Sequence, residues 1–332
     1  MKCIILDSHN SDGIALVEMK EPVPGPGEMK IKVKAAALNH RDQWCRQGKY
    51  PNLKDGIILG SDGCGTVSEV GEDVERHWLG KEVLINPGND WGDDPAAQSG
   101  KFTILGMPHH GTFAEYICVK ADRVHEKPAH LDANQGAALP LAGLTAFRAL
   151  TRQGKLKRGD KVLVTGFGGG VAQFASQFAL RSGAVVSVSS GEQWKLDKAL
   201  EMGVAAGYNY RSDWVGQAKA EMGGFDLIVD SAMGDTLNGL IDLANPGGRI
   251  VVYGATLGNP KQIDARKIFW KQLAIQGSTM GSDSDFEEML KWVSRHKISP
   301  QVDEVFPMNS AVAAFDKMKN SKQLGKLVLK IY

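Results

Sequence analysis

The 332-residue sequence has few cysteines, no long apolar run and almost no net charge. Its four cysteines are Cys3, Cys45, Cys64 and Cys118. Their spacing fits neither a zinc ribbon nor a disulfide framework, so we expect free thiols. The 39 Lys and Arg residues nearly balance the 38 Asp and Glu residues, which excludes a strong global field for nucleic acid or an anionic membrane. No apolar run reaches the roughly 18 residues of a membrane span, and the N-terminal apolar stretch is too short for a signal peptide. We therefore expect a cytoplasmic protein without nucleic-acid or membrane partners.

Length and composition predict two folded domains, at about 150 residues each. The first third has the pattern of β-structure. Met29, Ile31, Val33 and Ala35 alternate with lysines, which is the period of a half-buried strand. Short apolar runs separated by Gly and Pro continue to about residue 119 and predict a small barrel or sandwich. Residues 86–106 have little periodicity, and we expect a long surface lobe there.

From about residue 130 the pattern changes to alternating strands and helices. Apolar runs predict strands over residues 161–165, 185–189, 225–229 and 249–253, and a helical period follows the first two. This alternation predicts an α/β domain with a doubly wound parallel sheet. The chain ends in a helix around residues 315–318 and a strand over residues 326–331.

A glycine-rich loop lies between the strand at 161–165 and the next helix. Its residues are Gly166, Phe167, Gly168, Gly169, Gly170 and Val171. Glycine lets the backbone approach a pyrophosphate, and the helix N-terminus offers free N–H groups to it. The spacing is a variant of the GxGxxG fingerprint, and its position in a βαβ unit favours dinucleotide binding over a glycine-rich turn without a ligand.

The end of the second strand of this unit bears on the cofactor type. NAD-selective sites place Asp or Glu there, whereas this chain has Ser189 and Ser190. Small hydroxyl residues leave room for a 2′-phosphate, and Lys195 can supply a positive charge. Glu192 is the counter-argument, because it could serve NAD, and Lys195 has the alternative of a solvated helix position. We expect NADPH, with NADH as the less favoured cofactor.

Four segments then resemble blocks of the medium-chain dehydrogenase/reductase superfamily, in family order. They are residues 37–42 (ALNHRD), 59–63 (LGSDG), 138–145 (ALPLAGLT) and 325–330 (GKLVLK). The resemblance covers essentially the whole chain. It implies a GroES-like β-barrel catalytic domain that begins with residues 1–125, and a Rossmann domain over residues 126–270. Residues 271–332 would complete the Rossmann sheet and return to the catalytic domain.

The chain departs from the zinc alcohol dehydrogenases of this superfamily. Those enzymes carry Cys where this chain has Asn39, a His-Glu pair at Ser61 and Asp62, and a further ligand at Leu141. They often carry four cysteines in the lobe, and residues 86–107 have none. A catalytic zinc needs three N, S or O ligands and an open position. We therefore expect no metal.

The pattern is more similar to the zinc-free branch of quinone oxidoreductases, 2-alkenal reductases and enoyl reductases. Asn39, Asp42 and residues 48–51 (GKYP) match that branch. The similarity implies NADPH, activated C=C bonds or quinones as small-molecule substrates, and a homodimer or tetramer. It also implies cofactor contacts from Lys195, Tyr210, Gly254 and Lys326. An apolar edge strand around residues 273–278 would form the subunit contact.

Without a metal, hydrogen-bond donors must stabilise the oxygen that gains charge. Our candidates are Asn39 and Tyr50, with cofactor positioning and plain packing as their respective alternatives. By resemblance Thr145 faces the nicotinamide and His40 the pyrophosphate, but Thr145 could equally bond its own helix backbone. The sequence thus predicts a zinc-independent NADPH oxidoreductase. An alcohol dehydrogenase-like enzyme for simple alcohols and aldehydes, or a non-catalytic NADPH-binding protein, remain as alternatives.

Overall fold

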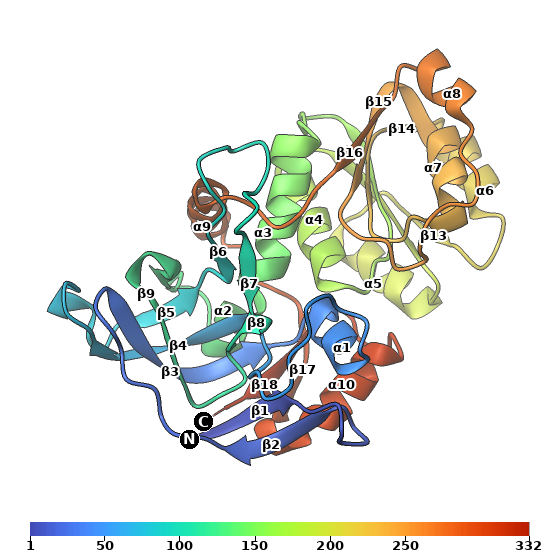
Figure 1. Cartoon of the computed structure of the whole chain (residues 1–332). Helices are drawn as coiled ribbons and strands as arrows, with labels where there is room; N and C mark the ends of the chain where they lie inside the picture. Colours follow the sequence, from blue (N-terminus) through green and yellow to red (C-terminus); the bar gives the residue numbers. More distant parts are fainter. Residues whose placement is uncertain (332) are drawn as a thin grey trace. The chain divides into compact units, whose positions relative to one another are not determined.

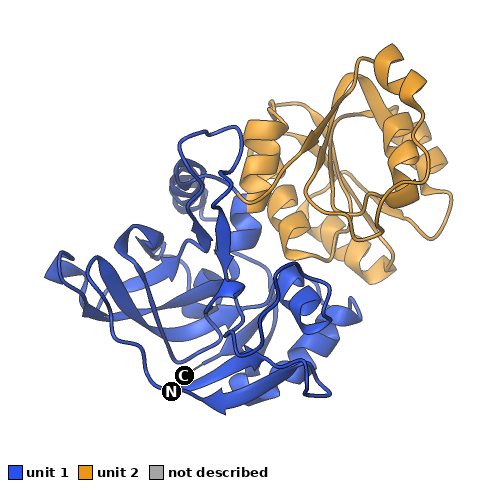
Figure 2. Cartoon of the chain, in the orientation of Figure 1, with its two compact units in different colours: residues 1–144, 281–332 blue, residues 145–280 orange. Residues whose placement is uncertain are grey.

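The computed structural model describes residues 1–331, which form two compact units. The first unit contains residues 1–144 and the C-terminal stretch from residue 281, and the second contains residues 145–280 (Figure 2). The second unit thus begins at Thr145, later than the residue 126 expected from the sequence. The reason is that helix α2 (Ala133–Ala138) packs on strands β3, β4 and β18 of the first unit.

The first unit is built on a seven-stranded mixed sheet to which both ends of the chain contribute (Figure 1). Its strand order is β10-β5-β4-β3-β18-β17, and β9 pairs with β3. The bounds are β3 (Glu28–Ala37), β4 (Asp62–Val70), β5 (Glu82–Ile85), β9 (Tyr116–Lys120), β10 (Val124–Glu126), β17 (Val302–Pro307) and β18 (Lys326–Lys330). Strands β1 (Lys2–Leu6) and β2 (Ile14–Glu18) form a separate antiparallel pair.

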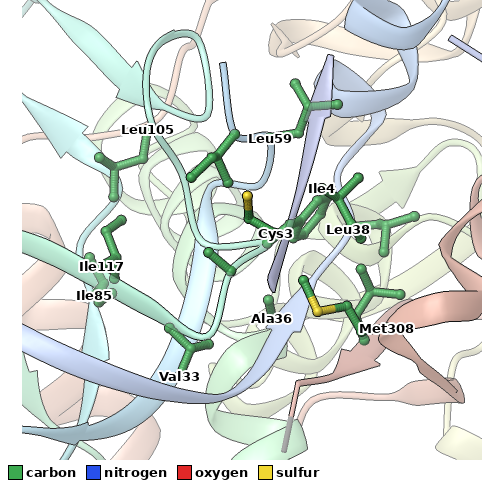
Figure 3. Packing of buried hydrophobic residues seen from close by; sticks show 14 of the residues in the cluster. Cys3, Ile4, Val33, Ala36, Leu38, Leu59, Ile85, Leu105, Ile117 and Met308 are labelled. Carbon is green, nitrogen blue, oxygen red and sulfur yellow. The ribbon is translucent and has the colours of Figure 1, made fainter. Parts of the chain in front are cut away.

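The core of this unit joins residues that are far apart in the sequence. Cys3 and Ile4 of β1 lie in one buried cluster with Leu38, Leu59 and Met308 (Figure 3). The expected alternation is observed in part. Ile31 and Val33 of β3 belong to the same cluster while Lys32 between them is exposed, but Lys30 is buried and pairs with Glu21 and Glu69. The helices are α1 (His40–Arg46), α2, α9 (Asp283–His296) and α10 (Ala311–Lys319), with short 3₁₀ turns at Arg76–Trp78, Ala121–Arg123 and Met308–Ser310.

The lobe after β5 is more regular than the sequence indicates. It contains a small sheet of β6 (Gly88–Asn89), β7 (Thr103–Leu105) and β8 (Pro108–His109). Trp91 is buried and makes an edge-on contact with Phe102, with ring centroids 5.2 Å apart. The Trp91 indole N–H donates to the Asp94 carbonyl over 3.0 Å. An aromatic pair therefore packs this lobe.

The second unit is a six-stranded parallel sheet with the order β13-β12-β11-β14-β15-β16. Its strands are β11 (Lys161–Val164), β12 (Val185–Ser190), β13 (Ala206–Asn209), β14 (Phe225–Asp230), β15 (Ala244–Val252) and β16 (Ala274–Gly277). The strand order reverses direction between β11 and β14, and α/β sheets bind ligands outside the carboxyl ends of their strands at such a point.

Helices connect the strands of this sheet. They are α4 (Gly170–Arg181), α5 (Gln193–Met202), α6 (Trp214–Met222), α7 (Leu237–Leu243) and α8 (Ala265–Trp270), with a 3₁₀ turn at Gly234–Thr236. Helix α3 (Pro140–Arg148) contains the boundary between the units and continues into a π-helical turn, Ala149–Gln153. In the described residues no helix is both long and apolar enough to cross a membrane.

Candidate active site

In the first unit, two strand registers bring a lysine, an amide and a carboxylate together. Ala37 at the end of β3 pairs with Asp62 of β4 and with Val328 of β18. Asn39 follows β3 at the start of α1, and Lys326 is the first residue of β18. The exposed fractions of Asn39, Asp62 and Lys326 are 7%, 0% and 4%. The three side chains thus form a buried polar cluster.

The Lys326 ammonium lies at the centre of this cluster. It donates to Asn39 Oδ1 over 2.6 Å, to the Leu38 carbonyl over 2.7 Å and to Asp62 Oδ2 over 3.1 Å. The Asn39 amide donates to the same Asp62 oxygen over 3.0 Å, and the Leu141 N–H donates to Asp62 Oδ1 over 2.8 Å. Each of the three ammonium protons therefore has an acceptor, as a buried charge requires.

Arg41 lies between Ser61, the neighbour of Asp62 in the chain, and Tyr50. The Arg41 guanidinium is buried and donates to Ser61 Oγ over 2.7 Å and to the Met107 carbonyl over 3.0 Å. Its Nε donates to the Tyr50 hydroxyl over 3.3 Å, and its Cζ lies 4.9 Å from the centroid of the Tyr50 ring. The phenol oxygen is thus held in place, while its own proton remains available for donation.

Three glycines make this arrangement sterically possible. Gly60 has φ +92°, and a Cβ there would lie 2.3 Å from the Phe113 ring. A Cβ at Gly111 would lie 1.9 Å from the Gly60 carbonyl oxygen, and one at Gly106 would lie 2.7 Å from it. The loop that follows β7 therefore packs backbone against backbone on the residues that precede Ser61. This contact is not predictable from the sequence, because a glycine does not indicate which segment of the backbone packs against it.

Burial changes the acid–base properties of two groups beside the cluster. Asp42 is fully buried, and loss of solvent raises its pKa to about 6 although Arg41 and the Asn39 N–H oppose the shift. The pKa of His40 is lowered, first by loss of solvent around the ring and then by the Lys326 ammonium. We therefore expect a neutral imidazole at pH 7.

In the second unit the glycine loop lies where the sequence places it, between β11 and α4. Gly166 has φ +69°, a conformation that favours glycine. Helix α4 begins after Gly169 without a side-chain cap, so its first N–H groups are available to a ligand. Thr165 Oγ1 donates to Asp230 Oδ1 over 2.6 Å, which ties the ends of β11 and β14 together. Gly254 follows β15, and a Cβ there would lie 3.1 Å from the Ser231 carbonyl.

The carboxyl end of β12 holds the other residues expected at the cofactor. Ser189, Ser190 and Lys195 are buried, and Tyr210 is half exposed. The Tyr210 ring covers Gly191, because a Cβ at Gly191 would lie 2.7 Å from it. Glu192 Oε1 accepts a hydrogen bond from Arg211 Nη2 over 2.5 Å. The Thr145 hydroxyl lies 4.0 Å from Met280 Sδ.

Comparisons with known proteins agree across both units. Residues 25–129 match the family model "Alcohol dehydrogenase GroES-like domain", and residues 170–295 match "Zinc-binding dehydrogenase". A zinc-type alcohol dehydrogenase-like protein of Leptosphaeria maculans is 38% identical, with 94% of this chain and 93% of that protein covered. An acryloyl-coenzyme A reductase of Sulfurisphaera tokodaii is 29% identical, with 99% and 100% covered. A solved NAD-dependent alcohol dehydrogenase is 34% identical, with a TM-score of 0.94 and 100% of both chains covered.

The chain belongs to the medium-chain dehydrogenase/reductase superfamily. This confirms the fold class expected from the sequence, a GroES-like domain with a Rossmann domain. It also establishes an NAD(P)H-dependent oxidoreductase, so the alternative of a non-catalytic binding protein is not retained.

The superfamily includes zinc enzymes, but the donor set of this member does not fit a zinc ion. The fold brings together Asn39, Ser61, Asp62 and Leu141, the four positions at which the sequence resemblance predicts that zinc ligands are missing. The place between Asn39 and Asp62 is filled by the Lys326 ammonium, the Ser61 hydroxyl bonds Arg41 and the Leu105 carbonyl, and Leu141 offers a backbone N–H. Residues 1–331 contain no group of three His, Cys, Asp or Glu side chains that could hold a metal.

The structure therefore connects two of the expected site residues in the first unit, Asn39 and Lys326. Tyr50 contacts Arg41, which bonds Ser61 rather than either of those residues. The structure places the glycine loop, Gly254, Ser189, Ser190, Lys195 and Tyr210 at the carboxyl ends of the parallel strands. Their roles as catalytic or cofactor-binding groups stay predictions. Sequence reasoning missed Arg41 as the link to Tyr50 and Arg211 as the partner of Glu192, since neither contact has a local signature.

Proposed function

We propose that this protein is a zinc-independent, NADPH-dependent oxidoreductase that transfers hydride to activated C=C bonds or to quinones. The observation that carries the proposal is the Lys326 ammonium between Asn39 and Asp62, at positions that hold zinc ligands in related alcohol dehydrogenases. A zinc ion activates a plain carbonyl as a Lewis acid. An ammonium whose three protons all have acceptors inside the protein does not replace that function.

The substrate class follows from the donors that remain. The Tyr50 hydroxyl can donate to a developing oxyanion, and one N–H of the Asn39 amide is left after its bond to Asp62. One or two neutral donors suit an acceptor whose negative charge spreads over a conjugated system. NADPH, when bound, supplies the hydride. The substrate gains that hydride at an electron-poor carbon and a proton from Tyr50 or water, and is thereby reduced by two electrons.

The cofactor preference rests on the end of β12. Ser189 and Ser190 stand where NAD-selective Rossmann domains place an acidic residue, and Lys195 lies on the first turn of α5. Glu192, which follows this strand end, has its charge paired by Arg211. A 2′-phosphate would therefore not meet an unpaired carboxylate at this strand end.

The rival function is an alcohol dehydrogenase-like activity on simple alcohols and aldehydes. The name of the 38% identical Leptosphaeria maculans protein favours it. The two functions differ in metal content and in substrate, so one set of measurements separates them.

The test measures initial rates with NADPH and NADH on an enal, a quinone, a saturated aldehyde and, with the oxidised cofactors, ethanol. We expect the fastest turnover with NADPH and a conjugated acceptor, no stoichiometric zinc by elemental analysis, and unchanged rates after chelation. Stoichiometric zinc that is needed for turnover, or faster conversion of ethanol or the saturated aldehyde, contradicts the proposal.

A further inference from the structure

The ends of two parallel strands bring a carboxylate and a guanidinium together in the second unit. Strands β12 and β13 pair with Ser190 opposite Asn209, so the residues that follow the two strands lie side by side. There Arg211 Nη2 donates to Glu192 Oε1 over 2.5 Å. The register of the sheet, rather than proximity in the sequence, creates this ion pair.

The backbone around the ion pair is held by other contacts. The Tyr210 N–H donates to the Ser190 carbonyl over 3.1 Å, and the Arg211 N–H donates to Asn209 Oδ1 over 3.0 Å. Both charged side chains are substantially exposed, 43% for Glu192 and 66% for Arg211. An ion pair of that exposure contributes little to stability. The turn does not need it, and both charges are accessible to a ligand at the strand end.

The two charges have opposite effects on the two nicotinamide cofactors. A carboxylate at this position accepts hydrogen bonds from ribose hydroxyls and repels a 2′-phosphate. A guanidinium binds a phosphate through parallel N–H donors. A phosphate monoester carries about −1.5 to −2 charges at pH 7, so its affinity depends strongly on the net charge nearby.

We propose that the Glu192–Arg211 ion pair sets the strength of the preference for a 2′-phosphorylated cofactor. Arg211 acts as a cation for the 2′-phosphate in addition to Lys195, and Glu192 weakens that attraction. The guanidinium has five N–H donors, so it can bond a phosphate while it remains paired with Glu192. This inference rests on the proposed NADPH dependence. It assigns the strength of the preference for NADPH over NADH to a pair of residues outside the glycine loop.

The test uses the full chain and two fragments that carry only the adenosine end, 2′,5′-ADP and 5′-AMP, in titration calorimetry. We expect Arg211→Gln to weaken 2′,5′-ADP by about tenfold or more, since a charge-assisted contact is lost and Glu192 is left unpaired. The affinity for 5′-AMP should stay within about twofold, because the two fragments differ only in the phosphate that Arg211 contacts. Glu192→Gln should strengthen 2′,5′-ADP by about two- to fivefold, and the double variant should lie between the two single variants.

The matched controls are Lys198→Gln and Glu201→Gln. These residues form an exposed ion pair on helix α5, which begins directly after Glu192, and their exposed fractions are 55% and 64%. Both controls should leave the two affinities unchanged, and added salt should reduce the effect of Arg211→Gln.

The outcomes separate this inference from the proposed function. If the unmodified protein prefers 2′,5′-ADP and Arg211→Gln retains that preference, or weakens both fragments equally, the role of the ion pair is wrong while NADPH dependence stands. If the unmodified protein binds both fragments alike, the proposed NADPH preference is itself wrong, and this inference fails with it.

Discussion

Lys326 Nζ lies 2.6 Å from Asn39 Oδ1, although 287 residues separate the two in the sequence. The contact exists because β18, from the end of the chain, pairs with β3. It places a positive charge against the Asn39 amide and the Asp62 carboxylate. The charge is balanced by Asp62, whose carboxylate lies 3.1 Å from the ammonium, so the site combines a buried cation and a buried anion.

Replacing Lys326 by Met tests whether this ion pair maintains the site. The variant leaves the Asp62 carboxylate fully buried without its cation, which costs about 3–5 kcal/mol of folding free energy. We expect a large fall in the thermal unfolding temperature.

The control for this prediction is the double variant Lys326→Met, Asp62→Asn. Removing the second charge as well should recover part of the lost stability, because no uncompensated charge stays buried. A single variant as stable as the unmodified protein, or a double variant no better than the single one, would show that the two charges do not depend on each other.

Tyr50→Phe tests the phenol as a donor in the reaction. Loss of one donor to an oxyanion costs about 2.7–4 kcal/mol in the barrier, so we expect kcat to fall by about 100-fold or more with little change in KM. Tyr116 is a matched control, since it also lies in the first unit beneath a cation, with Lys30 Nζ 5.1 Å from its ring centroid. Tyr116→Phe should retain kcat. Equal rates for Tyr50→Phe and the unmodified enzyme would assign Tyr50 to packing.

Asp42 predicts a specific dependence of stability on pH. Its pKa is raised from 3.8 to about 6 in the folded protein, chiefly by burial. The folded state therefore binds the proton more tightly than the unfolded state. Below pH 4 both states are protonated and there is no penalty, and as the pH rises from 4 to 6 the ionised carboxyl destabilises the fold by up to about 3 kcal/mol.

The measurement is thermal unfolding between pH 4 and pH 8. Relative to the unmodified protein, Asp42→Asn should gain stability as the pH rises through this window and then stay level. The exposed Asp197, replaced by Asn, serves as the control and should follow the unmodified profile. Parallel profiles for Asp42→Asn and the unmodified protein would refute the prediction.

The sequence contained enough information for the strands and the cofactor loop. Alternation of apolar and charged residues located β3, and the glycine loop lies between β11 and α4 as expected, because these signals are local. The helical period expected after the strand at 185–189 corresponds to α5. The four positions at which the sequence departs from the zinc enzymes, Asn39, Ser61, Asp62 and Leu141, lie close together in the fold. The expectation that no metal binds there stays a prediction.

The contacts within the site were not predictable in the same way. We expected Lys326 as a cofactor contact, and the structure shows its ammonium bonded to Asn39, Asp62 and the Leu38 carbonyl. The pairing of β18 with β3 decides this, and no local pattern encodes that register. The ion pair of Glu192 and Arg211 depends in the same way on the register of β12 and β13.

We propose that β16 forms a homodimer contact. β16 is the edge strand of the parallel sheet, and all its residues from Ala274 to Gly277 are exposed. Phe269 and Trp270 lie just before it, with exposed fractions of 68% and 83%. An apolar edge strand risks open-ended association, and a two-fold contact with a second copy closes it.

A dimer would have twice the 35.9 kDa chain mass by light scattering. Ile275→Lys should give monomers, since two ammonium groups would face each other across the axis, whereas Val23→Lys, at an exposed apolar residue of the first unit, should not. A monomeric unmodified protein at micromolar concentration would count against the contact, and a dimer that persists in Ile275→Lys would assign the interface to another surface.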